Sequence, residues 1–304
     1  MRGEHRLDVR AFLHDELLQT LPADYDRDDL LAASSATYVI HQDIAYTYSK
    51  PIADLRQRLV VVPKQRHLDQ RRIADSVRVE LADVTDVRRR TDRFRNAVVQ
   101  LRIPHVEERV EFRIRAVLQR SILQRSIDAR RGHHAGGGWA VASSTLTNPD
   151  SAIAAAAAQV RRRDVATTVR AMSTFVRDAF EYCHDVTSVG TTAAAAWALR
   201  RGVCQDMAHV MLAMCACLDI PARYVSGHLV GDGASHAWVE AFDASRGEVI
   251  SIDPTHDRLT DLRYITTATG RDYRDVAPPS GTYASTGARG TLQVRKTIRL
   301  AEVA

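Results

Sequence analysis

Hydrophobic residues follow two different periods along this chain. Between residues 36 and 120 they recur at every second position in short runs separated by polar turns, which is the period of a strand with one buried face. The runs cover 37–48, 59–63, 76–84, 96–103 and 109–118. Several short strands at this spacing predict a β-sandwich or a β-barrel.

Farther along, the period changes to that of an α-helix. Over 164–182, apolar residues recur at spacings of three and four. A short Ala-rich helix is expected over 191–200, and 205–218 predicts a helix that is apolar all round and therefore buried. Two alternating runs, 236–242 and 248–253, flank a polar turn and predict a β-hairpin.

The change of period suggests a division into two domains. A glycine-rich segment over 132–139 is the best linker candidate, and 304 residues with 45% hydrophobic positions suffice for two cores. We therefore expect an N-terminal extension over 1–35, a β domain over 36–130, a linker over 131–160 and a second domain over 161–304. Residues 291–300 predict a closing strand that pairs with the sheet of this second domain.

Composition narrows the possible partners. The formal net charge is +5, but the arginines at 88–90 and 161–163 lie near acidic residues and no aromatic residues are interleaved with them. We therefore expect no nucleic-acid partner. The longest apolar run, 152–160, is too short to span a bilayer, so we expect no membrane association either.

Two further observations favour a cytoplasmic location. Charged residues are interspersed through the first eight positions, where a signal peptide would need an apolar core. The chain has four cysteines without the regular spacing of a disulfide framework. Both are expected of a protein that stays in a reducing compartment.

Cys204 is the candidate nucleophile of this sequence. Gly202 permits a tight turn and a helix is predicted from 205 onward, so Cys204 is expected at a helix N-terminus. There the positive end of the helix dipole favours a thiolate, which is the nucleophilic form of the side chain. The plainer alternative is a small core residue, which we expect for Cys215 and Cys217.

A histidine and an aspartate follow in suitable places. His236 begins the first strand of the predicted hairpin and Asp253 ends the second, so the two are expected to lie opposite each other. The aspartate would then hold one imidazole tautomer while the other ring nitrogen faces the thiol. Each residue alone also has a structural interpretation, since an Asp before Pro often caps a turn. Together they predict a Cys204, His236 and Asp253 triad.

Metal sites and other cofactors are not expected. Cys215 and Cys217 are spaced so that a helix points their sulfurs to different faces. The pairs His133-His134 and Cys183-His184 lack partners at a recognisable ligand spacing.

Four motifs carry a resemblance to a known family. They are Arg201-Gly-Val-Cys-Gln-Asp-Met-Ala-His209, Asp219-Ile-Pro-Ala-Arg-Tyr-Val-Ser-Gly227, His236-Ala-Trp-Val-Glu240 and Asp253-Pro-Thr255. These closely resemble the core of the bacterial transglutaminase-like superfamily. The resemblance continues through 270–278, a segment typical of the subgroup that carries an N-terminal β domain. His228 and His256 stand where an aromatic residue and an asparagine, respectively, are commoner.

The resemblance implies an α+β fold, with a papain-like transglutaminase core preceded by an N-terminal β-sandwich-like domain. It assigns Cys204 as nucleophile, His236 as base and Asp253 as the orienting acid. It also implies that Tyr182 and Gln205 are substrate-contact or oxyanion residues. Some relatives use calcium. We do not expect a calcium requirement in this chain, because no acidic loop here resembles an EF-hand.

The same resemblance implies cysteine-dependent acyl transfer on a peptide, a protein or a small amide, by crosslinking, deamidation or hydrolysis. A biosynthetic amide synthase that takes its acyl group from a carrier protein as a thioester is the alternative, with the same triad. A non-catalytic binding protein of the same fold is a third alternative, which the presence of all three triad residue types disfavours.

Overall fold

The computed structural model describes residues 21, 27–122, 139, 143–231 and 235–304. The chain divides into two compact units: unit 1 comprises Met1–Gln124 and Pro278–Ala304, and unit 2 comprises Arg125–Ala277. Among the described residues, none of the helices has the length and apolar character needed to cross a bilayer.

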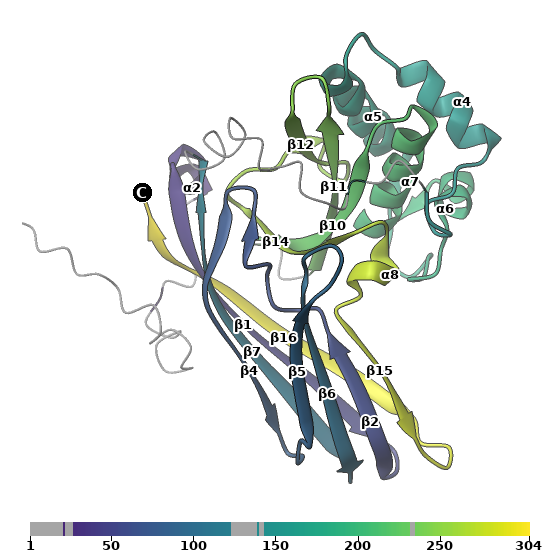
Figure 1. Ribbon diagram of the computed structural model, residues 1–304. Helices are drawn as coiled ribbons and strands as arrows, with labels where there is room; N and C mark the ends of the chain where they lie inside the picture. Colours follow the sequence, from purple (N-terminus) through teal and green to yellow (C-terminus); the bar gives the residue numbers. More distant parts are fainter. Residues whose placement is uncertain (1–20, 22–26, 123–138, 140–142, 232–234) are drawn as a thin grey trace, which may run out of the picture. The chain divides into compact units, whose positions relative to one another are not determined.

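Unit 1 is built from two antiparallel sheets (Figure 1). The first has the order β16 (Gly290–Val303), β1 (Ser35–Tyr48), β7 (Arg109–Ser121), β4 (Gln70–Glu80) and β3 (Arg66–His67). The second has the order β15 (Pro279–Ala284), β2 (Ile52–Leu59), β6 (Ala97–Val106) and β5 (Asp86–Thr91). A short helix, α2 (Arg27–Ala32), precedes β1.

The two sheets enclose one apolar core. Ile44 and Phe112 from the first sheet and Leu55 and Ile103 from the second belong to the same buried cluster. Alternation along β2 and β6 points every second side chain into this core. The predicted β-sandwich is therefore confirmed.

One predicted strand in this unit is wrong. The run 59–63 was expected to pair, but β2 ends at Leu59 and the next three valines are buried outside any strand. The Val60 backbone N–H instead donates to the carbonyl of Pro278. An apolar run records burial, and burial does not require strand pairing.

Residues 278–304 belong to unit 1. The second domain, predicted over 161–304, therefore ends earlier than expected. We expected the strand over 291–300 to pair with the sheet of the second domain, but β16 pairs antiparallel with β1, placing Leu300 opposite Tyr38. The neighbouring β15 pairs with β2. β16 thereby satisfies the backbone donors and acceptors on the side of β1 that does not face β7.

The predicted linker over 131–160 also ends earlier than expected. Its last ten residues form α4 (Ser151–Val160), which is capped by the Asp150 carboxylate and packs on α7 (Cys204–Cys217). This segment is rich in alanine, which favours a helix, and it buries one apolar side that includes Ile153. The glycine-rich run 132–138 lies outside the described residues.

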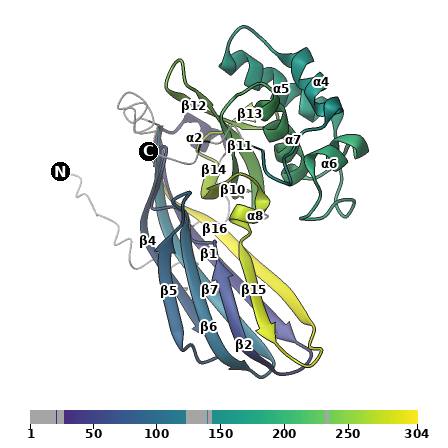
Figure 2. The same ribbon diagram turned by 45° about the vertical axis from the view of Figure 1, so that its right-hand side comes forward.

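Unit 2 combines helices with a second antiparallel sheet. The sheet has the order β13 (Arg258–Leu259), β12 (Glu248–Asp253), β11 (Ser235–Asp243), β10 (Ala222–Leu229) and β14 (Tyr264–Gly270). The other elements are α5 (Val165–Ala179), α6 (Ala193–Leu199), α8 (Tyr273–Val276) and the parallel pair β8 (Glu181–Tyr182) and β9 (Arg201–Gly202). Figures 1 and 2 show α4 to α7 gathered on one side of this sheet.

The predicted helices and hairpin of unit 2 are present. α7 contacts α4, α5 and α6 as well as β10 and β11, and its residues from Gln205 to Cys215 are buried without interruption. β11 and β12 form the expected hairpin, with Val239 opposite Ile252. The α+β class is confirmed, and α7 is held from several sides, which fixes its N-terminus in the unit.

Candidate active site

Cys204 is the first residue of α7, as the sequence predicts. The turn into the helix is closed by Asp206, whose carboxylate accepts the Val203 backbone N–H at 2.9 Å and the Thr187 hydroxyl at 2.7 Å. A Cβ atom at Gly202 would lie 2.5 Å from that carboxylate. Glycine is therefore needed here to let the aspartate close over the turn.

His236 lies near the beginning of β11 with its side chain almost fully buried. Its Nε2 is 2.8 Å from Oδ2 of Asp253, and the Cys204 side chain is close enough to the ring to affect its electrostatics. Since Nε2 faces the aspartate, Nδ1 is the nitrogen left for the sulfur. The indole of Trp238 stacks on the ring with centroids 6.2 Å apart. The imidazole is thus held between the thiol and the carboxylate.

The strand next to His236 makes room for these rings. His236 pairs across the sheet with Gly227 on β10. A Cβ atom at Gly227 would collide with the Ile265 carbonyl oxygen and would lie 2.5 Å from the Trp238 ring. Any side chain at this position would displace the indole on which the imidazole rests.

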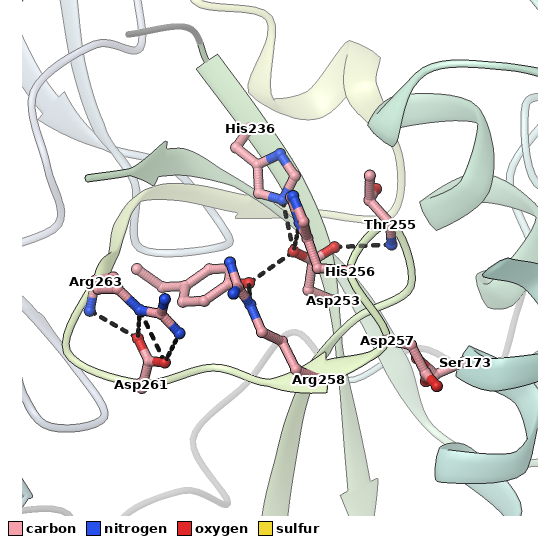
Figure 3. Close-up of polar contacts among 10 residues, drawn as sticks. Ser173, His236, Asp253, Thr255, His256, Asp257, Arg258, Asp261 and Arg263 are labelled. Atoms are coloured by element: carbon pink, nitrogen blue, oxygen red, sulfur yellow. Dashed lines mark hydrogen bonds and ion pairs between the residues drawn. The ribbon is translucent and has the colours of Figure 1, made fainter. Parts of the chain in front are cut away.

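Asp253 is completely buried and its carboxylate is surrounded by donors (Figure 3). Oδ2 receives hydrogen bonds from His236, from Nδ1 of His256 at 2.7 Å and from the Tyr264 hydroxyl at 2.7 Å. Oδ1 accepts the Thr255 backbone N–H at 2.9 Å. These contacts fix both oxygens, so the carboxylate holds His236 in one orientation.

The electrostatics of the pair follow from these contacts. Burial raises the pKa of the Asp253 carboxyl, but the hydrogen bonds from His236 and His256 outweigh burial and hold that pKa far below its usual range. Burial lowers the pKa of the His236 imidazole, but its bonds to Asp253 and Cys204 outweigh it and raise the pKa to about 10. His236 is therefore an imidazolium beside the sulfur at neutral pH.

The two other predicted site residues lie in different surroundings. Tyr182 is on β8, which pairs with β9 so that Tyr182 stands opposite Gly202, two residues before Cys204. Its side chain is exposed and meets the His184 ring edge-on. Gln205 is largely buried, and its amide nitrogen donates to the Val189 carbonyl at 3.4 Å. Neither contact defines a catalytic role.

Two residues that were not predicted contact Asp253. His256 was noted only because asparagine is commoner there, although its position three residues after Asp253 within one turn was a usable signal. Tyr264 had no local signal, because it reaches Asp253 from β14 at the opposite edge of the sheet. Arg258 in turn donates to the Tyr264 hydroxyl at 2.7 Å.

The three remaining cysteines lie in other environments. Cys215 is fully buried, and burial raises the pKa of its thiol to about 12, as expected of a core residue. Cys217 is partly buried at the end of α7, and burial raises its pKa as well. The sulfur of Cys183 accepts a bond from the Arg201 guanidinium at 3.3 Å.

Potential metal ligands gather around Asp253. In the part of the chain that the structure describes, His236, Asp253 and His256 are the group of three whose ligand atoms lie within 4.8 Å of one another. Imidazole nitrogen and carboxylate oxygen are ligands that zinc accepts. Here both imidazoles bond directly to the same carboxylate oxygen, and these hydrogen bonds account for the cluster. The expectation of a metal-free site stays a prediction.

Comparisons with known proteins agree with this architecture. Residues 154–254 match the transglutaminase-like superfamily, and residues 38–119 match the bacterial transglutaminase-like N-terminal region. The first match contains Cys204, His236 and Asp253, and the second covers most of the sandwich strands that precede unit 2. The chain belongs to the bacterial transglutaminase-like proteins that combine this N-terminal region with the transglutaminase-like core.

Two curated relatives match part of the chain. An uncharacterized protein of Mycobacterium leprae (strain TN) is 38% identical over 143 residues, which are 44% of this chain and 50% of that protein. An uncharacterized protein of Mycobacterium tuberculosis (strain ATCC 25618 / H37Rv) is 33% identical over 40% of this chain and 43% of its own length. The chain thus spans half or less of these curated relatives.

A solved structure resembles nearly the whole chain. A Cytophaga hutchinsonii protein, provisionally named a cysteine protease, superimposes with a TM-score of 0.69 and 22% identity over 88% of this chain and 91% of that one. At this identity the likeness establishes the shared fold.

Proposed function

We propose that the protein is a cysteine-dependent acyltransferase or hydrolase that acts on amides through a thioester on Cys204. The observation that carries this proposal is the buried His236 ring, which bonds to Asp253 at 2.8 Å and interacts electrostatically with the Cys204 side chain. Such a chain of thiol, imidazole and carboxylate is the arrangement of an activated nucleophile. Its position at the N-terminus of α7 adds the positive end of a buried helix.

The first half of the reaction forms the thioester. The Cys204 thiolate attacks the amide carbonyl carbon, forming a C–S bond and placing negative charge on the carbonyl oxygen. As the tetrahedral intermediate collapses, the C–N bond breaks and the His236 imidazolium gives its proton to the leaving amine. Asp253 keeps the ring in place throughout and remains ionised.

The second half returns the enzyme to its starting state. Water, ammonia or a primary amine loses a proton to the neutral His236 ring and attacks the thioester carbon. The C–S bond then breaks, the acyl group leaves with the acceptor, and the imidazolium again stands beside a Cys204 thiolate. The choice of acceptor decides between hydrolysis and transfer.

Supporting residues have separate roles in this proposal. Tyr264 and His256 are positioning residues, because both act on the reaction through Asp253. Gln205 is proposed as an oxyanion donor, since one of its two amide N–H groups remains after its bond to Val189. Tyr182 is proposed as a substrate contact beside the turn that precedes Cys204.

The acyl donor is proposed to be a peptide, a protein or a small amide, and a carrier-bound thioester is the alternative. A cytoplasmic location is proposed with it, because all four cysteines are free in the folded chain.

The experiment presents both donor classes to the purified protein. Glutamine-containing peptides and peptide anilides represent amides, and acyl thioesters of N-acetylcysteamine represent the alternative, each with water, ammonia or a primary amine as acceptor. We expect turnover of amides, its loss in Cys204→Ala, and its retention in the matched control Cys183→Ser. Turnover of thioesters alone would favour the amide synthase, and turnover by Cys204→Ala at the wild-type rate would exclude this mechanism.

A further inference from the structure

Unit 1 contains a cavity of about 170 Å³ at one side of the sandwich. It lies where β4 of the first sheet comes close to β5 and β6 of the second, and every residue that lines it belongs to unit 1. The lining has two kinds of side chain. Val62, Val98 and Val99 are apolar, and Arg72, Arg89 and Arg90 are cationic.

The cationic side of the cavity carries more positive charge than the Asp75 carboxylate beside it can neutralise. Arg72 and Arg89 both pair with Asp75, through Nε at 3.1 Å and Nη1 at 2.5 Å respectively. The side chain of Arg90 forms no hydrogen bond or ion pair with any residue that the structure describes. Two guanidiniums therefore share a single carboxylate, and a third cation lies beside them.

Several donors at this site remain available. A guanidinium has five N–H groups, and Arg72 uses three, on Asp75, the Pro63 carbonyl and the Gln65 side chain. Among the residues that the structure describes, the Arg89 side chain bonds to Asp75 alone. Among the described residues, these two side chains thus keep unused N–H groups beside the cavity.

The buried position of Arg72 makes an added negative charge favourable. Its side chain is only 12% exposed. Burial lowers the pKa of this guanidinium, Asp75 opposes that shift, and the nearby charge of Arg89 adds to it. A second anion in the cavity would relieve both the desolvation and the repulsion.

We propose that this cavity is a binding site for a small organic anion, namely a carboxylate that carries a short aliphatic group. The carboxylate would lie on the guanidiniums of Arg72 and Arg89, whose planar forks match its geometry. The aliphatic group would pack on the valines. A volume near 170 Å³ is small for a ligand pocket, so the chain should be short. This site does not depend on the proposed catalytic function.

The test is calorimetric titration of the full chain with pentanoate at low ionic strength. Inorganic phosphate serves as an anion without an aliphatic group, and pentanol as the aliphatic group without a charge. Arg89→Gln is the test variant, because its side chain is half exposed and the substitution should leave the fold intact. Arg88→Gln is the matched control, since Arg88 is on the same strand, exposed, paired with Asp86 and absent from the lining.

We expect one pentanoate per chain, at least tenfold weaker binding by Arg89→Gln, and unchanged binding by Arg88→Gln. Phosphate and pentanol should each bind at least tenfold more weakly than pentanoate. Circular dichroism checks that both variants are folded, and Arg90→Gln provides a second lining variant if Arg89→Gln is not. No binding of pentanoate, equal binding by the folded lining variant and wild type, or phosphate binding as tight as pentanoate would overturn the proposal.

Discussion

At the scale of single residues, Asp253 is the fixed point of the candidate site. Three donors from three different segments converge on one of its oxygens, and a backbone N–H occupies the other. His236, in contrast, is held on one side by Asp253, and in the proposed mechanism its other side faces the attacking sulfur. The orientation of the imidazole therefore depends on the carboxylate.

Substitution of the carboxylate should slow the reaction without abolishing it. In Asp253→Asn the amide can stabilise the wrong imidazole tautomer and cannot support an imidazolium. We expect a rate loss of roughly ten- to a thousand-fold, smaller than that of Cys204→Ala. Steady-state kinetics on the amide substrate measure it, and a thermal transition within a few degrees of wild type shows that the fold survives. Full activity would reduce Asp253 to a turn cap.

The same variant should change stability in a way that depends on pH. The raised pKa of His236, about 10 against an ordinary value near 6.5, stabilises the fold fully below about pH 6.5 and progressively less as pH rises toward 10. The lowered pKa of Asp253 stabilises it above about pH 4 and less on acidification. The melting temperature of wild type should therefore exceed that of Asp253→Asn more at pH 5.5 than at pH 9.5. An equal difference at both values would contradict the coupled pair.

The places of Cys204, His236 and Asp253 in the fold could be predicted from sequence, because each residue stands at the end of a local pattern. Cys204 precedes an apolar helix, and His236 and Asp253 are at the two ends of a hairpin. Tyr264 could not be predicted, because its contact with Asp253 arises only when β14 joins the sheet beyond β10. A residue that reaches the site only because of the order of strands in the sheet does not change the local spacing of hydrophobic residues in the sequence.

At the scale of elements, α7 places its three cysteines in different surroundings. Cys204 begins the helix beside the His236 imidazolium, whereas Cys215 is buried in its middle. Cys183 is the cysteine that could compete with Cys204 for a thiol reagent, because it is partly exposed and lies beside the Arg201 guanidinium. A guanidinium adds charge but takes no part in proton transfer.

Iodoacetamide at neutral pH should consequently label Cys204 before the other cysteines. Peptide mass spectrometry at short reaction times measures the order. His236→Gln should slow labelling at Cys204 and leave Cys183 unchanged, which makes Cys183 the internal control. Equal or preferential labelling at Cys183 in the wild-type protein would count against an activated thiol at Cys204.

At the scale of the whole molecule, the sequence predicted the two kinds of unit but not how the chain passes between them. Alternation identifies a strand over 291–300, yet says nothing of its partner, and that partner proved to be β1, more than two hundred residues earlier. Unit 1 is therefore discontinuous, with unit 2 inserted between β7 and β15. At this separation in sequence, the pairing depends on the backbone donors and acceptors of β1 that β7 leaves unpaired.

Removal of 278–304 should expose that edge. In a chain that ends at Ala277, the amides of β1 that bond to β16 should exchange hydrogen at least tenfold faster, since they lose their acceptors. Hydrogen exchange with mass spectrometry measures this, with the peptides of α7 in unit 2 as the control. Unchanged protection of β1 would show that the sandwich does not need its C-terminal strands.

The central claim is that Cys204 carries the acyl group. The most direct measurement is acid quenching of the protein during turnover of an amide substrate, followed by peptide mass spectrometry to locate the added mass. The account predicts an acyl adduct on the peptide that contains Cys204, removed by hydroxylamine as a thioester should be. The adduct should be absent from Cys204→Ala and present in Cys183→Ser. Turnover that proceeds with the acyl group on another residue, or an adduct that persists in Cys204→Ala, would contradict it.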